Sequence, residues 1–131
     1  MTAVKAFKVT CALIGFGEKV LVVQRSEGMH LPLKWEFPGG KIERNETEEE
    51  CVRREVKEEL NIDIEIIGKL SPVAYNYPNQ SIELIPFLAI YSGGEMKLAE
   101  HRRFQWLAKN ELLKLDWAEA DIPIVKEYLN L

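Results

Sequence analysis

Residues 40–62 of this chain read GKIERNETEEECVRREVKEELNI. Thr47 precedes Glu50 by the three-residue spacing of a capping box, so the sequence predicts that a helix begins there. The helix is expected to run to Leu60, because Asn61 tolerates the left-handed conformation that closes a helix. A stripe that would pack on a core recurs every four residues: Val52, Val56 and Leu60.

The same helix would gather acidic side chains in one sector of its surface, at positions i, i+3 and i+4: Glu55, Glu58 and Glu59. Like charges at these spacings repel each other by about a few tenths of a kcal/mol per pair. The neighbouring Arg54 can offset part of this repulsion. A hard divalent cation would relieve it fully, since Mg²⁺ prefers carboxylate oxygens, water and substrate phosphates. The alternative interpretation is an ordinary solvated helix rich in Glu and Lys.

An apolar stretch that ends in two glycines leads into this helix: Trp35, Glu36, Phe37, Pro38, Gly39 and Gly40. Glycines let the backbone approach a ligand closely, and the carbonyl of Gly39 can join a metal shell. A double glycine by itself usually indicates only a turn. Together with the acidic helix it predicts a site for a metal ion and phosphate.

This segment resembles the signature of the Nudix hydrolases, G-x5-E-x7-R-E-U-x-E-E-x-G-U, in which U is a bulky apolar residue. Val56 and Ile62 fill apolar positions, and the matching identities are Gly40, Glu46, Arg54, Glu55, Glu58 and Glu59. Asn61 stands where the family has glycine, and we expect the helix end to survive because Asn also tolerates positive φ. The resemblance extends to both ends of the chain and is strongest to the MutT-type members.

The resemblance implies Mg²⁺-dependent hydrolysis, with Mn²⁺ as a possible substitute, of a nucleoside triphosphate to the monophosphate and pyrophosphate. Water would attack the β-phosphorus. The Gly39 carbonyl, Glu58 and Glu59 would hold the essential metal. Glu55 would bind a further metal or take the proton from the attacking water, with Arg54 orienting the cluster.

Two further positions of the signature, Gly40 and Glu46, are expected to be structural. Glu46 can instead be a surface residue near a helix N-terminus. Glu100 stands where MutT-type enzymes carry an additional metal-binding Glu on a loop, and it would act as general base or outer metal ligand. The alternative is a solvated loop residue. His101 is expected to be a surface histidine.

The resemblance also implies a set of nucleotide contacts. Arg25 would contact phosphate or sugar through its fork of donors, unless it is an ordinary residue at a strand end. His30 lies in a loop where the family touches substrate. Tyr77 and Phe37 can sandwich a base or simply pack in the core. The remaining expected substrate-binding positions are Glu36, Pro38 and Gly39.

Asp121 stands where MutT has an Asn that reads an oxidised guanine through its amide. An ionised Asp only accepts hydrogen bonds, which favours an exocyclic amine such as cytosine N4 or adenine N6. The run from Ala120 to Pro123 also resembles the CTP-hydrolysing branch of the family. A protonated Asp can instead donate a hydrogen bond, and some oxidised-purine hydrolases use Asp in base reading. Asp121 can also simply cap the last helix.

The composition predicts one domain over residues 1–131, with 47% hydrophobic and 29% charged residues to build a core and a polar surface. A net charge of −4 argues against broad capture of nucleic acid polymers or acidic membranes, and it favours a free nucleotide as the partner. The sequence contains no stretch typical of a membrane span or a leader. Cys11 and Cys51 are expected to be buried thiols of a cytoplasmic protein, monomeric or homodimeric.

Alternation and turn residues predict strands over residues 4–14, 19–25, 62–69, 70–77, 81–91 and 104–107. Helices are predicted over 109–115 and 122–129, and a loop is predicted to begin at Gly93 and Gly94. Strands and helices mix without βαβ regularity, which predicts an α+β fold with a mixed sheet. The Nudix resemblance implies the same arrangement as an α/β/α sandwich.

The leading functional hypothesis is metal-dependent hydrolysis of nucleoside triphosphates for nucleotide-pool sanitation, acting on oxidised substrates such as 8-oxo-dGTP or on cytidine triphosphates. A second keeps the chemistry but takes a linked nucleoside diphosphate such as ADP-ribose. A third is a non-catalytic nucleotide-sensing module. Such modules commonly lack acidic residues of the signature, whereas Glu55, Glu58 and Glu59 are all present here.

Overall fold

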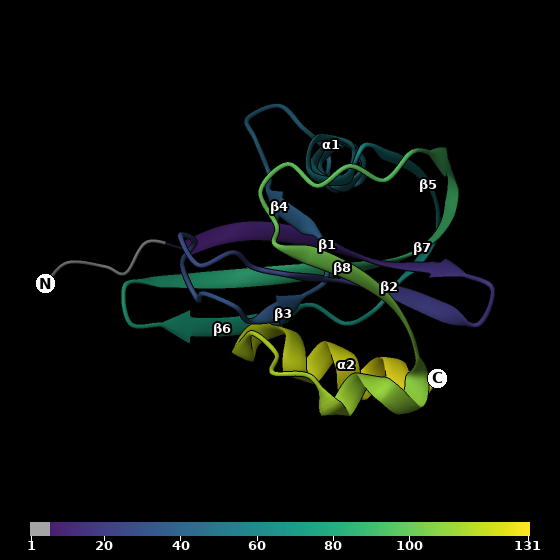
Figure 1. Ribbon diagram of the computed structural model, residues 1–131. Coiled ribbons are helices and arrows are strands. Elements are labelled where there is room, and N and C mark those ends of the chain that lie inside the picture. Colours follow the sequence, from purple (N-terminus) through teal and green to yellow (C-terminus); the bar gives the residue numbers. More distant parts are fainter. Residues whose placement is uncertain (1–5) are drawn as a thin grey trace, which may run out of the picture.

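The computed structural model describes residues 6–131. An eight-stranded sheet lies between helix α1 on one face and helix α2 with two short 3-10 helices on the other (Figure 1). The helices are α1 (Glu48–Leu60), η1 (Lys109–Lys114), η2 (Glu119–Asp121) and α2 (Ile122–Leu129). The strands are β1 (Ala6–Phe16), β2 (Lys19–Gln24), β3 (Trp35–Glu36), β4 (Gly39–Lys41), β5 (Ile62–Lys69), β6 (Val73–Tyr77), β7 (Gln80–Gly94) and β8 (Arg103–Ala108). The predicted α+β fold with a central mixed sheet is confirmed.

The sheet is mixed because β1 and β7 run parallel, from the pair Ala6 and Ser81 to the pair Gly15 and Ile90. The other pairings are antiparallel, and the main path through the sheet is β3-β2-β1-β7-β5. The short strand β4 pairs with β1, which brings the double glycine against the centre of the sheet.

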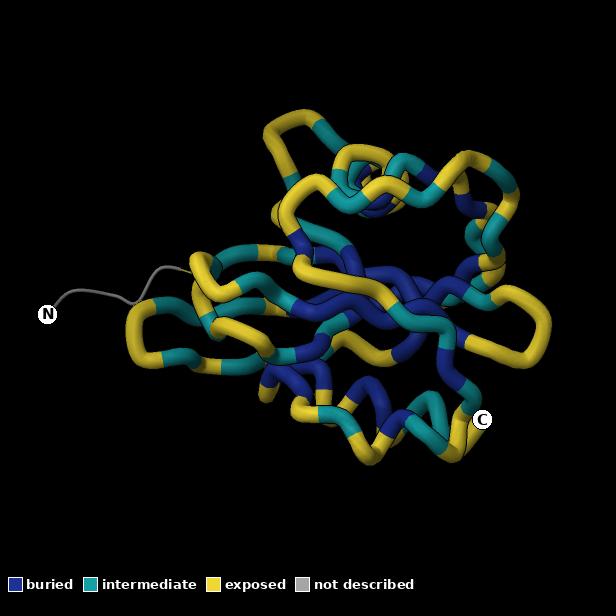
Figure 2. The backbone as a smooth tube through the Cα atoms, viewed as in Figure 1, coloured by how far each residue is buried: buried dark blue, intermediate teal, exposed yellow. Residues whose placement is uncertain are grey.

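Two hydrophobic clusters fill the space on either side of the sheet. Successive residues of β1 point to opposite faces, so Leu13 packs on the α2 side and Ile14 on the α1 side. Figure 2 shows the buried residues running through the central strands and along the inner sides of the helices. The predicted stripe of α1 is fully buried: Val52, Val56 and Leu60. Both cysteines are free and buried, as predicted.

The ends of α1 follow the sequence prediction. Thr47 accepts a hydrogen bond from the Glu50 backbone at 3.1 Å, and the Glu50 carboxylate accepts one from the Thr47 backbone at 2.9 Å. Asn61 closes the helix in the left-handed conformation, with φ of 60° and ψ of 29°. Its side-chain amide also donates to the Glu95 carbonyl at 3.0 Å, which ties the helix end to a distant segment.

Some predicted boundaries were wrong. The expected loop at Gly93 and Gly94 is the end of β7, where a Cβ on Gly94 would lie 2.6 Å from the Asn61 carbonyl oxygen. Here glycine permits the last residues of the strand to approach the end of α1 closely. The predicted strand over 70–77 begins only at Val73, and the predicted helix over 109–115 is a 3-10 helix. The predicted strand over 4–14 continues to Phe16, while residues 4 and 5 lie outside the described residues.

Candidate active site

The double glycine allows β4 to fit between the sheet and the acidic face of α1. Gly39 has a φ of +157°, and a Cβ there would lie 2.0 Å from the Thr10 carbonyl oxygen. A Cβ on Gly40 would lie 2.4 Å from the Glu55 carboxylate. A larger side chain at Gly39 would therefore push the loop away from β1, and one at Gly40 would displace the Glu55 carboxylate.

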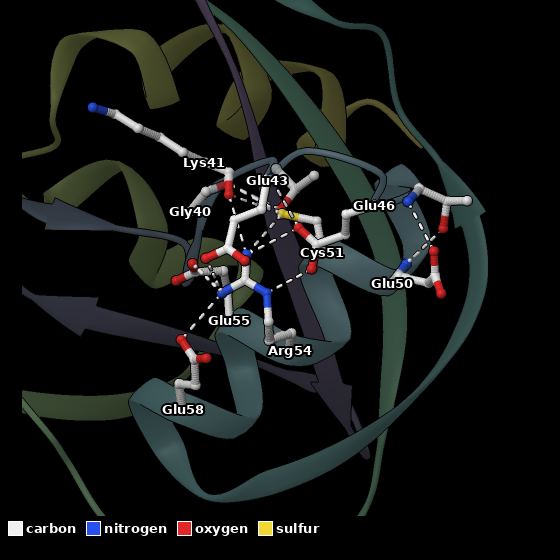
Figure 3. A network of polar contacts seen from close by, with 11 residues as sticks. Gly40, Lys41, Glu43, Glu46, Glu50, Cys51, Arg54, Glu55 and Glu58 are labelled. Atoms are coloured by element: carbon white, nitrogen blue, oxygen red, sulfur yellow. Dashed lines mark hydrogen bonds and ion pairs between the residues drawn. The ribbon is translucent and has the colours of Figure 1, made fainter.

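Arg54 is the centre of the polar network in Figure 3. Its guanidinium donates to both carboxylate oxygens of Glu46, at 2.5 and 3.0 Å. It also donates to Glu55 at 2.8 Å and to Glu58 at 3.1 Å. A further hydrogen bond at 3.2 Å reaches the Lys41 carbonyl, so a single side chain links the loop and the acidic face of α1.

Glu46 is held as an ionised carboxylate. Hydrogen bonds from Arg54, and then from the backbone of Glu43, lower the pKa of Glu46 to about 2. Its side chain is only 12% exposed, so it is not simply a solvated residue of the surface. The Arg54 pKa is raised in turn, chiefly by the hydrogen bond to Glu46.

The carboxyl groups of α1 differ in their surroundings. Glu59 points inward and accepts a hydrogen bond from the Gly39 backbone at 3.0 Å. Burial, reinforced by the charges of Glu36 and Glu55, raises the pKa of Glu59 to about 9. Burial also raises the pKa of Glu55, whereas the Glu58 side chain is 60% exposed.

These groups suit a divalent cation, although they do not surround one point. They offer oxygen donors, which Mg²⁺ and Mn²⁺ prefer, and the buried Glu59 carboxyl group lies near the negative charges of Glu36 and Glu55. Within residues 6–131, no three or more acidic, His or Cys side chains converge as a metal-holding group. Arg54 contacts Glu55 and Glu58 instead, and Glu58 is exposed enough to rotate away from it.

A cavity of about 590 Å³ opens beside Glu59, on the side of the site away from Arg54. Its lining contains most of the predicted substrate-binding residues, which come from distant segments: Arg25, His30, Glu36, Phe37, Gly39, Tyr77 and Asp121. Pro38 is not part of this lining; it is buried, and its carbonyl accepts a hydrogen bond from Ala12 at 2.8 Å. Gly39 and Glu59 thus stand between the cavity and the acidic cluster.

Glu36 is bound from two sides at the edge of this cavity. Arg25 donates through Nη1 to both Glu36 oxygens, at 3.0 and 3.2 Å, and through Nε to the His30 carbonyl. The His101 Nε2 atom lies 2.8 Å from Glu36 Oε2. The prediction that His101 is a surface histidine was therefore wrong, since the residue is 6% exposed. No local pattern signals this contact, because its partners are 65 residues apart.

Asp121 also lines this cavity, close enough to Glu36 for the two groups to interact electrostatically. It is buried, and its carboxyl group accepts a hydrogen bond from the Phe37 backbone at 2.9 Å. Burial, and next the charge of Glu36, hold the pKa of Asp121 well above its ordinary value. Asp121 is the N-cap residue just before α2 but makes no side-chain capping hydrogen bond, so the simple cap interpretation was wrong.

The aromatic residues of the cavity are partly committed to packing. The Phe37 ring is buried against Trp117, with 4.9 Å between centroids. The Tyr77 hydroxyl accepts a hydrogen bond from the Ala120 backbone at 3.1 Å, and the His30 ring meets Tyr77 edge-on. Core packing accounts for most of the Phe37 surface, while Tyr77 and His30 form the more open wall.

Glu100 is exposed and does not line the cavity. The segment before it is attached to the end of α1, since Ala99 donates to the Glu59 carbonyl at 3.0 Å. Glu100 therefore follows a residue that is bound to the acidic helix, but it does not join the Arg54 network. Among the helices of residues 6–131, none is long and apolar enough to cross a membrane.

Comparison with known proteins identifies similar chains. The NUDIX domain model matches residues 5–128. An 8-oxo-dGTP diphosphatase of Proteus vulgaris is 44% identical over 69 residues, which cover 53% of this chain and 62% of that protein. The CTP pyrophosphohydrolase of Escherichia coli (strain K12) is 28% identical over 97% of this chain and 94% of its own. A solution NMR structure of the DNA mismatch repair protein MutT (family Nudix hydrolase) from methicillin-resistant Staphylococcus aureus 252 is 40% identical, with a TM-score of 0.77 over 96% of this chain and 97% of that one.

Proposed function

The chain belongs to the Nudix hydrolase family, and we propose that it hydrolyses a nucleoside triphosphate to the monophosphate and pyrophosphate with Mg²⁺. The observation that carries this proposal is the cavity that begins at Glu59. It joins an acidic helix face, suited to a metal-bound polyphosphate, to a pocket of the size and polarity that a nucleoside requires. We propose that residues 1–131 form one such domain.

The acidic face of α1 would handle the polyphosphate. The Gly39 carbonyl with Glu58 and Glu59 would hold Mg²⁺, or Mn²⁺ in its place. Bound metal would neutralise phosphate charge and make water more acidic. Glu55, whose pKa is raised by burial, is suited to accept the proton of the attacking water or to bind a second ion. Glu100 would join from its exposed segment.

Arg54 would keep the acidic side chains in place. Its hydrogen bonds to Glu55 and Glu58 offset part of the repulsion between these carboxylates. Glu46 anchors Arg54 from the loop, and Gly40 leaves the space for the Glu55 carboxylate. These roles position the cluster and do not require contact with substrate.

The part of the cavity lined by Glu36 and Asp121 would bind the base. Glu36 and Asp121 present two carboxyl groups there, and a base with an exocyclic amine can donate to such acceptors. We propose cytosine or an oxidised guanine, both of which carry such an amine. Relatives named for CTP and for 8-oxo-dGTP support both choices. Arg25 would sit near phosphate or sugar, with His30 and Tyr77 along the open wall.

A nucleotide panel tests the proposal. Pyrophosphate release with Mg²⁺ is measured on CTP, 5-methyl-dCTP, dGTP and 8-oxo-dGTP, with ADP-ribose as a further substrate. Glu58→Gln should reduce turnover at least about 100-fold, because a metal ligand is lost. The matched control is Glu49→Gln on the exposed first turn of the same helix, which should keep full activity.

Three outcomes would contradict the proposal. Full activity of Glu58→Gln would remove the assigned metal role. Hydrolysis of ADP-ribose with inert triphosphates would favour the linked-diphosphate alternative. Nucleotide binding without turnover by the wild-type protein would favour a sensing module. Circular dichroism of each variant confirms that lost activity does not reflect lost structure.

A further inference from the structure

His101 is a polar residue in an unusual place. Its side chain is only 1% exposed, and its Nε2 atom lies 2.8 Å from Glu36 Oε2. Its other ring nitrogen, Nδ1, is buried and has no hydrogen-bond partner among the residues that the structure describes. An apolar side chain of similar size would fill this space without burying an unpartnered nitrogen. Packing alone therefore does not explain a histidine here.

The single hydrogen bond shows which ring nitrogen must carry a proton. A carboxylate is an acceptor, so Nε2 carries a proton and donates to Glu36. The ring is thus used for one contact, the one to Glu36.

The backbone around His101 holds it firmly between two parts of the site. Ala99 donates to the Glu59 carbonyl at 3.0 Å, at the end of the acidic helix. Arg102 donates to the Gln24 carbonyl at 2.9 Å, at the end of β2. A side chain fixed on both sides can hold a partner in one orientation at little additional entropic cost.

Glu36 has the position and charge of a group that recognises the base. Its carboxylate lines the cavity between Glu59 and Asp121, and its charge raises the pKa of both groups. A negative group would repel a polyphosphate, so we assign Glu36, with Asp121, to the base. Arg25 and His101 occupy part of its acceptor capacity. A carboxylate has about four lone-pair sites, so acceptor capacity remains for a ligand.

We propose that His101 is a positioning residue for base selection: it fixes the Glu36 carboxylate so that this group accepts a hydrogen bond from the exocyclic amine of the base. This inference rests on the proposed nucleotide hydrolysis. By this inference, His101 acts on the recognition of the base, whereas the neighbouring Glu100 would act near the metal. Without the Nε2 donor, Glu36 is held by Arg25 alone and can rotate out of register with the amine.

The test compares two nucleotides that differ at the amine. CTP and UTP carry N4 and O4 at the same ring position; if CTP is a poor substrate, dGTP and dITP form the equivalent pair for the purine 2-amino group. The measured quantity is the ratio of kcat/KM within the pair. For His101→Leu the ratio should fall about tenfold, through KM for the amine-bearing member, because a hydrogen bond to a charged acceptor contributes about that much.

Two amide variants separate positioning from packing. The Gln side-chain nitrogen reaches the place of Nε2, so His101→Gln should restore most of the ratio. The Asn nitrogen falls short of that place, so His101→Asn should behave like His101→Leu. A packing role predicts instead that all three variants lower stability and slow both nucleotides equally, and that result would overturn the proposal.

Glu36→Gln provides a further check that does not require His101 variants to fold. Glu36→Gln should lower the ratio of kcat/KM values as much as His101→Leu does. Adding His101→Leu to it should lower the ratio no further, since both residues act through the Glu36 carboxylate. In the wild-type protein, two-bond ¹H–¹⁵N spectra should show a proton on Nε2 of His101; a ring with its proton on Nδ1 alone would contradict the proposal. If the wild-type protein showed no Mg²⁺-dependent hydrolysis, the proposed function itself would be refuted. If His101→Leu hydrolysed both nucleotides with an unchanged ratio of kcat/KM values, only this inference would be refuted.

Discussion

Asp121→Asn is expected to stabilise the protein increasingly as the pH rises. Burial holds the pKa of the Asp121 carboxyl well above its ordinary value of 3.8, so the folded protein keeps this group protonated where the unfolded chain ionises it. The amide of Asn has nearly the same shape and does not titrate. Its carbonyl oxygen can still accept the hydrogen bond from the Phe37 backbone.

The sign and size follow from proton linkage. The folded state binds the extra proton, so the contribution of Asp121 to stability is fully present below 3.8 and is lost as the pH rises toward the folded pKa. Each pH unit within this window corresponds to about 1.4 kcal/mol. The free energy of unfolding of the variant, minus that of the wild type, should therefore grow by about 1.4 kcal/mol per pH unit and level off above the folded pKa.

Urea unfolding of the metal-free protein, repeated from about pH 4 to about pH 8, measures this difference. Asp116→Asn is the matched control, because its side chain is 73% exposed and forms only a surface ion pair with Lys34. That variant should stay within about 1 kcal/mol of the wild type throughout. A difference for Asp121→Asn that is constant or falls with pH would show that the buried carboxyl is ionised, and the reasoning from burial would fail.

Two other substitutions test the residue that closes α1 and the arginine that holds Glu46. Asn61→Ala should be less stable than Asn61→Gly by about 1 kcal/mol, measured by urea unfolding, because φ of 60° disfavours a Cβ and both variants lose the amide bond to Glu95. Equal stabilities would show that the backbone relaxes. Arg54→Gln should raise the pKa of Glu46 from about 2 toward its ordinary 4.5, measured by ¹³C NMR of the carboxyl group. A pKa that stays low would assign the effect to the Glu43 backbone instead.

Much of the fold could be predicted because its signals are local. The capping box joins residues three apart, the buried stripe of α1 repeats every four residues, and the left-handed Asn61 closes the helix in the same short stretch. The double glycine indicated that the backbone approaches another group closely, and the structure shows that Gly39 approaches the backbone of Thr10. Gly94 misled the prediction because it allows close approach to Asn61, far earlier in the chain, which no local pattern reveals.

The sequence by itself determined the acidic helix, its caps and the family signature, since side chains on one helix face are ordered by the regular rise of the backbone. Only the tertiary structure decided that His101 meets Glu36 across 65 residues and that Asp121 meets the Phe37 backbone across 84. Those contacts depend on which strands pair and in which register, and on how the segments that follow them are attached. The phosphate end of the site could therefore be predicted, while the base end required the assembled sheet.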